Sequence, residues 1–84
     1  MRDTLRSPRQ IKLRKLLRDC REKRGLTQAD VAARLNKPQS FVAKYEGGER
    51  DLSAIEFIDV VQALGLEPVA VMRQLLKVLD GDTT

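Results

Sequence analysis

Signals that start and stop helices recur along this chain, and they leave room only for short helical segments. Ser7-Pro8 marks one start, because serine caps a helix and proline suits its first position. Thr27 is a second cap, and Ser53 with Glu56 three residues later has the pattern of a capping box. No run of alternating β-branched residues indicates a strand. The sequence therefore predicts an all-α fold.

Each predicted start is followed by a matching stop. Gly25, Gly47-Gly48 and Gly65 suit the left-handed conformation that closes a helix, and Asn36 tolerates it. The predicted chain is a single domain of five helices, with a core over about 8–68 and a fraying tail at 80–84. The expected helices are 8–24, the segment from the Thr27 cap to Asn36, about 39–46, the segment from Ser53 to Gly65, and 69–79.

Apolar residues at helical spacing indicate which side of each helix faces the core. In the fourth helix two stripes fit the pattern equally well. The expected core positions are Leu13, Leu16, Leu17 and Cys20; Val31, Ala32 and Leu35; Val42 and Tyr45; then either Ile55, Ile58 and Val61 or Phe57, Val60 and Val61, with Leu64.

The composition excludes much chemistry. The chain has no histidine and a single cysteine, so no zinc constellation and no histidine-based catalytic triad is expected. We therefore expect no enzyme activity and no cofactor. A lone cysteine fits a reducing cytoplasm, and on the apolar stripe Cys20 is favoured as a buried hydrophobe over a redox sensor. No apolar run approaches the ~18 residues that a membrane span needs.

Positive charge is concentrated in the first part of the chain. Residues 1–24 contain ten basic and three acidic residues, whereas residues 25–84 contain six basic and nine acidic ones. Such a field attracts polyanions, although charge alone does not distinguish nucleic acid from acidic lipid. An organelle transit peptide is disfavoured, because the stretch runs into a capped helix. Arg2, Arg6 and Arg9 form either an arm over phosphates or, as the favoured interpretation, a solvated terminus.

Two short helices joined by Asn36-Lys37-Pro38 have the spacing of a helix-turn-helix. Residues 13–68 resemble the phage-repressor/Cro type, the xenobiotic-response-element (XRE) family. The resemblance lies in the segments 25–32 and 39–50, in Leu35 and in Ala63-Leu64-Gly65. It implies a compact five-helix, lambda-repressor-like DNA-binding domain of bacterial or phage origin. The family usually has glycine where Asn36 stands and a Ser/Thr cap where Pro38 stands.

In such a fold the second helix of the motif enters the major groove of double-stranded DNA. We expect base contacts from the outward residues Gln39, Ser40 and Lys44, because Gln matches adenine and Lys matches guanine. The resemblance implies that Gln28 contacts the DNA backbone and braces Gln39. The other expected backbone contacts are Thr27, Phe41, Gly47 and Arg50, although packing beneath the preceding helix is as plausible for Phe41.

The family packs the end of the first helix against the end of the third. A fork-type pair of Arg21 with Glu46 is therefore expected to orient the recognition helix, and DNA contact by Arg21 is the less favoured role.

The last helix is the expected homodimer interface, because its apolar residues exceed what a small core buries. The alternative is that they complete the monomer core. The residues concerned are Val69, Met72, Leu75, Leu76 and Leu79.

We therefore expect a sequence-specific transcriptional regulator, in particular a dimeric repressor on a palindromic operator. The alternatives are the antitoxin of a toxin–antitoxin pair, whose partner would be a protein, and a restriction–modification controller.

Overall fold

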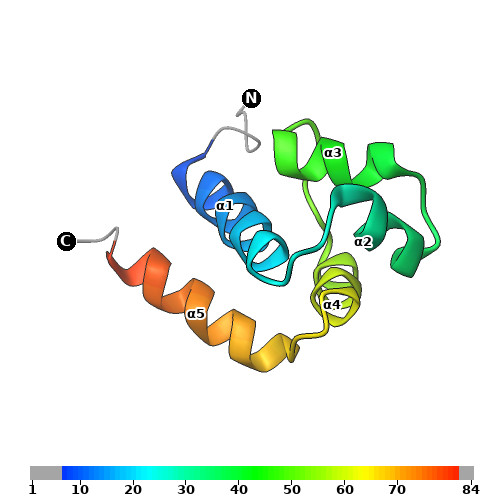
Figure 1. Cartoon of the computed structure of the whole chain (residues 1–84). Helices are drawn as coiled ribbons and strands as arrows, with labels where there is room; N and C mark the ends of the chain where they lie inside the picture. Colours follow the sequence, from blue (N-terminus) through cyan, green and yellow to red (C-terminus); the bar gives the residue numbers. More distant parts are fainter. Residues whose placement is uncertain (1–6, 82–84) are drawn as a thin grey trace.

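A computed structural model describes residues 7–81 of the chain, and within them it contains five α-helices and no strand (Figure 1). The all-α prediction is confirmed. The fifth helix starts one residue earlier than expected and includes Asp80, which had been assigned to the tail. The helices are α1 (Pro8–Lys23), α2 (Gln28–Leu35), α3 (Gln39–Gly47), α4 (Ala54–Ala63) and α5 (Pro68–Asp80).

The predicted caps start the helices. The Ser7 hydroxyl accepts a hydrogen bond from the Gln10 amide at 3.1 Å, and Pro8 occupies the first turn of α1. Both halves of the capping box at Thr27 are present, since the Thr27 amide also donates to Asp30 at 2.9 Å. At α4 the Ser53 amide donates to Glu56 at 2.9 Å. These bonds satisfy amide groups that the first helical turn leaves without a partner.

The link between α2 and α3 depends on one left-handed residue. Asn36 has φ 57° and ψ 43°, and the following Lys37 amide donates back to the Ala32 carbonyl at 3.0 Å. Pro38 precedes α3 in an extended conformation and makes no side-chain cap. The two departures from the family pattern therefore preserve the turn.

Substitution of Asn36 is expected to separate backbone strain from side-chain loss. Asn36→Ala should destabilise the protein by about 1–2 kcal/mol, because an alanine in the left-handed region brings Cβ close to the next carbonyl. Asn36→Gly should cost little, since glycine has no Cβ. Urea unfolding of both variants measures the difference, and equal losses of stability would contradict this explanation.

The core is formed by one side of every helix. In α4 the stripe of Phe57, Val60 and Val61 is the buried one, while Ile55 and Ile58 are exposed. The buried stripe is the one on the side where α4 packs against α2 and α5, so Ile55 and Ile58 lie on the outer side of the helix. The buried residues are Leu17, Val31, Ala32, Val42, Tyr45, Phe57, Val60, Val61, Leu64, Val71, Leu75 and Leu79.

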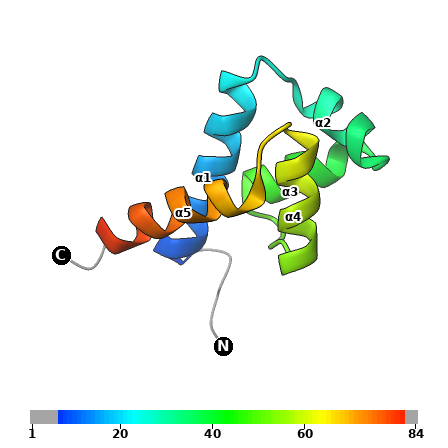
Figure 2. The same cartoon turned by 90° about the horizontal axis from the view of Figure 1, so that it is seen from below.

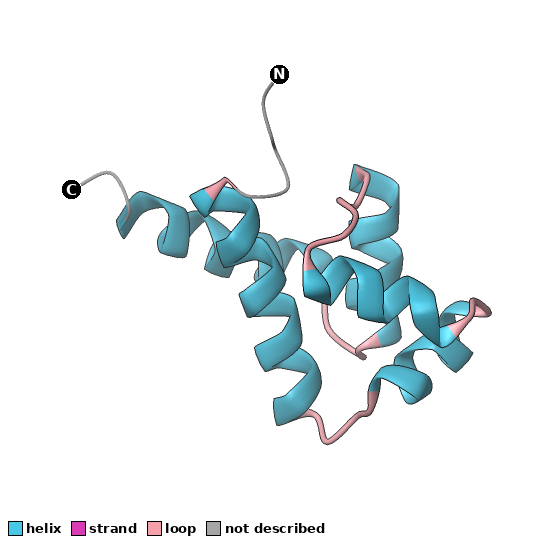
Figure 3. Cartoon of the chain, turned by 90° about the horizontal axis from the view of Figure 1, so that it is seen from above, coloured by secondary structure: helices cyan, strands magenta, loops and turns pink. Residues whose placement is uncertain are grey.

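α1 lies between α3 and α5, so the helix-turn-helix and the last helix are on opposite sides of the molecule (Figure 1). Seen from below, α5 is nearest the viewer, and it packs against α1 and α4 (Figure 2). Seen from above, short loops join the helices (Figure 3). The arrangement leaves the outer face of α3 open to solvent.

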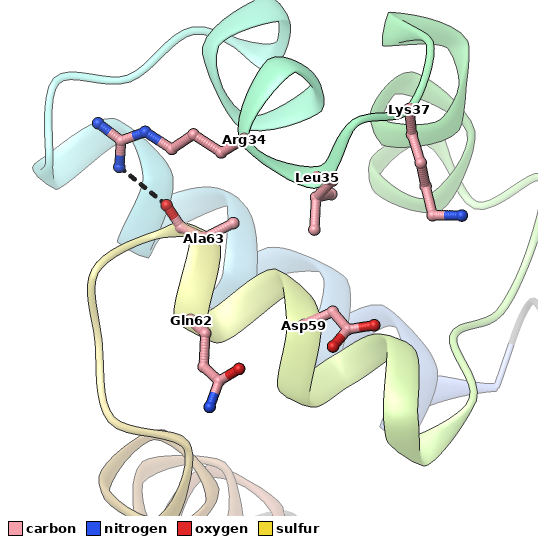
Figure 4. A pocket seen from close by; sticks show the side chains of 6 residues that line it. All are labelled: Arg34, Leu35, Lys37, Asp59, Gln62 and Ala63. Atoms are coloured by element: carbon pink, nitrogen blue, oxygen red, sulfur yellow. Dashed lines mark hydrogen bonds between the residues drawn. The ribbon is translucent and has the colours of Figure 1, made fainter.

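Two arginines hold the end of α4. Figure 4 shows Arg34 reaching from α2 to the Ala63 carbonyl, to which it donates at 2.8 Å, beside a depression of about 510 Å³. Arg24, which follows α1, donates to the Gly65 carbonyl at 3.5 Å. The φ of Gly65 is +78°, a left-handed conformation that side chains other than glycine rarely adopt, so this turn favours glycine.

Candidate nucleic-acid interface

The outer face of α3 is polar and exposed. Gln39, Ser40 and Lys44 are all exposed on it, opposite the fully buried Val42 and the buried Tyr45. The structure therefore brings the three predicted base-contact residues onto one face of a single helix. An amide, a hydroxyl and an ammonium group on this face have the donors and acceptors that base edges in a major groove match.

Glu46 fixes α3 to the two helices before it. Its carboxylate accepts from Arg21 Nε at 2.7 Å and from Arg21 Nη2 at 3.0 Å, which is the fork pair expected from the sequence. Arg21 also donates to the Leu26 carbonyl at 2.8 Å, between α1 and α2. The Glu46 side chain is only 4% exposed and that of Arg21 12%. Hydrogen bonding to Glu46 raises the pKa of the Arg21 guanidinium, so Arg21 stays charged.

Gln28 is the second residue that binds Glu46. Its amide Nε2 donates to the Glu46 carboxylate at 3.0 Å, and the expected bracing of Gln39 by Gln28 stays a prediction. Gln28 is half-buried at the first turn of α2, whose amide groups favour a phosphate. Thr27 is exposed beside it as the cap. The network thus holds one expected backbone-contact residue, Gln28, against α3, and Thr27 directly precedes it in the chain.

Phe41 packs, as one of its two expected roles held, and Arg50 forms contacts that the sequence did not reveal. The half-buried Phe41 ring makes an edge contact with Tyr45, with centroids 5.6 Å apart. The Arg50 guanidinium lies 4.8 Å from the Phe41 centroid and donates twice to Glu56, at 3.2 and 3.1 Å. These bonds hold the pKa of Glu56 below its usual value. Packing is therefore the observed role of Phe41, although it packs against α3 and the following loop.

Only part of the expected dimer surface is free. Val69, Met72 and Leu76 are 55%, 40% and 51% exposed, whereas Leu75 and Leu79 are each 8% exposed and complete the core. The last two residues therefore have little surface left for a partner. Val69 and Met72 line a depression of about 400 Å³ together with Ile58 of α4. We call Ile58, Val69, Met72 and Leu76 the α4–α5 apolar face.

Other sequence expectations concern the first helix. Cys20 is half-buried, and burial raises the pKa of its thiol, which keeps it in the unreactive form. Arg9 is exposed at the start of α1, whereas Arg2 and Arg6 lie outside the described residues. No helix in the described part of the chain could cross a membrane. Residues 7–81 contain no cluster of three metal-ligating side chains.

A two-helix motif with a left-handed turn, packed on α1 and α4 and presenting a polar second helix, defines a helix-turn-helix protein. The family model described as "Helix-turn-helix" matches residues 17–71. This match covers more than half of the chain and includes all of α2, α3 and α4.

Several solved structures are similar. An XRE-family like protein from Pseudomonas syringae pv. tomato str. DC3000 is 43% identical, with 83% of this chain and 85% of that chain covered and a TM-score of 0.79. The restriction–modification controller C.AhdI from Aeromonas hydrophila is 29% identical over 74% of this chain and 94% of its own, with a TM-score of 0.67. The controller C.Esp1396I is 22% identical over 84% and 93%, with a TM-score of 0.78. No curated protein matches the chain.

The chain therefore belongs to the XRE family of helix-turn-helix proteins. It is a DNA-binding transcriptional regulator, as the resemblance of its sequence implied.

Proposed function

We propose that the protein is a sequence-specific repressor that binds a palindromic operator as a homodimer in the bacterial cytoplasm. The supporting observation is the exposed face of α3 with Gln39, Ser40 and Lys44, together with the bond by which Glu46 of the same helix holds the Gln28 amide. The expected base contacts on α3 and the expected backbone contact Gln28 on α2 therefore belong to helices that the buried Glu46 carboxylate joins. Such a rigid arrangement favours sequence-specific over purely electrostatic binding.

The α4–α5 apolar face supports the dimer. Three of its four residues belong to α5, which lies across α1 from α3, so pairing through α5 would leave both recognition helices free (Figure 1). A symmetric dimer presents two such helices to half-sites about one turn of DNA apart, which makes the operator palindromic. One helix alone contacts too few base pairs for useful specificity in a genome.

Selection of binding sites from random duplexes tests this proposal directly. The purified protein should enrich a two-fold symmetric sequence with two half-sites. Enrichment of no sequence would refute specific recognition, and enrichment of a single unpaired half-site would refute the dimer.

Loss of the Gln39 amide should change specificity more than affinity for unrelated DNA. Gln39→Ala is expected to remove about 1–3 kcal/mol of discrimination at one position of each half-site, because the bidentate contact to adenine is lost. Binding of each single-base variant of the selected site measures this discrimination. A uniform loss across all variants would instead indicate that Gln39 contacts only the DNA backbone.

A role as a restriction–modification controller is the second candidate. C.AhdI is matched over 94% of its length, and one C.Esp1396I structure is a tetramer in complex with its natural 35 base-pair operator. Mapping of the binding sites on the source genome distinguishes the candidates. A controller should occupy the promoter of a restriction endonuclease gene, and sites confined to other genes would exclude this role.

A further inference from the structure

Lys37 and Arg50 meet on the ring of Phe41, although they come from opposite ends of α3. The Lys37 ammonium lies 5.0 Å and the Arg50 guanidinium 4.8 Å from the ring centroid. Lys37 belongs to the turn before α3, and Arg50 to the loop after it. A half-buried aromatic ring thus gathers two cations that the chain would otherwise hold apart.

The position of Phe41 on α3 decides where this cluster lies. At about 100° per residue, Ser40, Ala43 and Gly47 mark the middle of the exposed face. Glu46 lies on one flank of that face, where it holds Gln28. Phe41 lies on the other flank. The recognition helix therefore has a donor group on one side and a pair of cations on the other.

We propose that Lys37 contacts a backbone phosphate and that Phe41 positions it, so that the Lys37–Phe41–Arg50 cluster binds the strand opposite the one that Gln28 contacts. The inference rests on the proposed binding of duplex DNA. A helix in the major groove, which is about 12 Å wide, has one phosphate backbone on each side. Donors on only one flank would leave the second backbone without a contact.

The charges of the cluster favour Lys37 as its phosphate ligand. Arg50 is already paired with Glu56 at 3.1 Å, and its side chain is 37% exposed. Lys37 is exposed, and within residues 7–81 its ammonium group lies over the face of Phe41 and forms no ion pair. Binding a phosphate would therefore require no ion pair of Lys37 to be broken, whereas Arg50 would share its guanidinium between Glu56 and the DNA.

The salt dependence of binding to the selected duplex tests this assignment. The slope of log K against log salt is negative. Lys37→Gln should make it less steep by about 0.9 for each bound protomer, the value for one lost phosphate contact. Lys37→Arg should restore the slope. Lys77→Gln removes the same charge from the exposed surface of α5, on the other side of the molecule, and should leave the slope unchanged.

Phe41 has its own pair of variants. Phe41→Tyr keeps the aromatic face and should retain the wild-type slope. Phe41→Leu keeps an apolar side chain but loses the ring face, so its slope should be less steep. Salt-dependent binding by the wild type together with an unchanged slope in Lys37→Gln would overturn the inference and leave the proposed function intact. A less steep slope in Lys37→Gln with an unchanged one in Phe41→Leu would overturn the positioning role. A wild type that bound no duplex would overturn the proposed function itself.

Discussion

Glu46→Ala is expected to destabilise the protein by about 3–5 kcal/mol, because it leaves the Arg21 guanidinium in a buried position without its carboxylate. The Gln28 amide loses its acceptor in the same variant. A chain of this size has a total stability of roughly 0.05–0.15 kcal/mol per residue, so much of the variant should be unfolded at physiological temperature. Urea unfolding followed by circular dichroism measures the loss.

The matched control is Glu49→Ala, which removes an exposed carboxylate three residues further along. It should change the stability by no more than ~0.5 kcal/mol, as surface substitutions usually do. Equal effects of the two substitutions would show that Glu46 is not the link between the helices.

A double variant separates folding from DNA binding. Arg21→Met with Glu46→Leu replaces the buried pair by apolar groups and should recover most of the stability. It still deprives Gln28 of its acceptor, so it should bind operator DNA more weakly than the wild type. Full binding by this variant would show that Glu46 serves only folding.

The second large effect concerns the dimer. Leu76→Glu places a charge in the α4–α5 apolar face, and by symmetry the interface would bury it twice. Since removing each ion from water costs several kcal/mol, the dissociation constant should rise by more than about a thousandfold. Sedimentation velocity across a concentration series measures this change.

Val78→Glu is the control for the dimer. Val78 is 37% exposed on the other edge of α5, where it lines the depression between α1 and α5, away from Val69 and Met72. The variant should dimerise like the wild type. Dissociation by Val78→Glu in place of Leu76→Glu would move the interface to the α1 side of α5.

The sequence predicts features of this fold that depend on neighbouring residues in the chain. Caps such as Ser53 and stops such as Asn36 are local, because each bonds to backbone within a few residues. The two stripes of α4 could not be distinguished, since both have helical spacing. Only the packing of α4 against α2 and α5 determines that Phe57 is buried and Ile58 is exposed.

The candidate site follows the same division. The exposed residues of α3 and the Arg21–Glu46 pair could be predicted, the latter from family resemblance. The bond from Gln28 to Glu46 could not, because the separation of these side chains depends on how α2 and α3 cross. The contact of Lys37 with Phe41 could not either, because it depends on the course of the turn before α3 and on the rotamer of each side chain. Arg50 was predicted as a phosphate contact from its loop position. The capping box predicts a bond between Ser53 and Glu56, but nothing in the sequence indicates that Arg50 also pairs with Glu56.

The arginines at the end of α4 bear on how the operator is spaced. Arg34 and Arg24 fasten the turn between α4 and α5 to α2 and to the end of α1. These two bonds restrain the turn that joins α4 to the proposed dimer helix α5. In the proposed dimer the separation of the two recognition helices should therefore vary little. An operator with one extra base pair between its half-sites should then bind only where its DNA is deformed to match that separation.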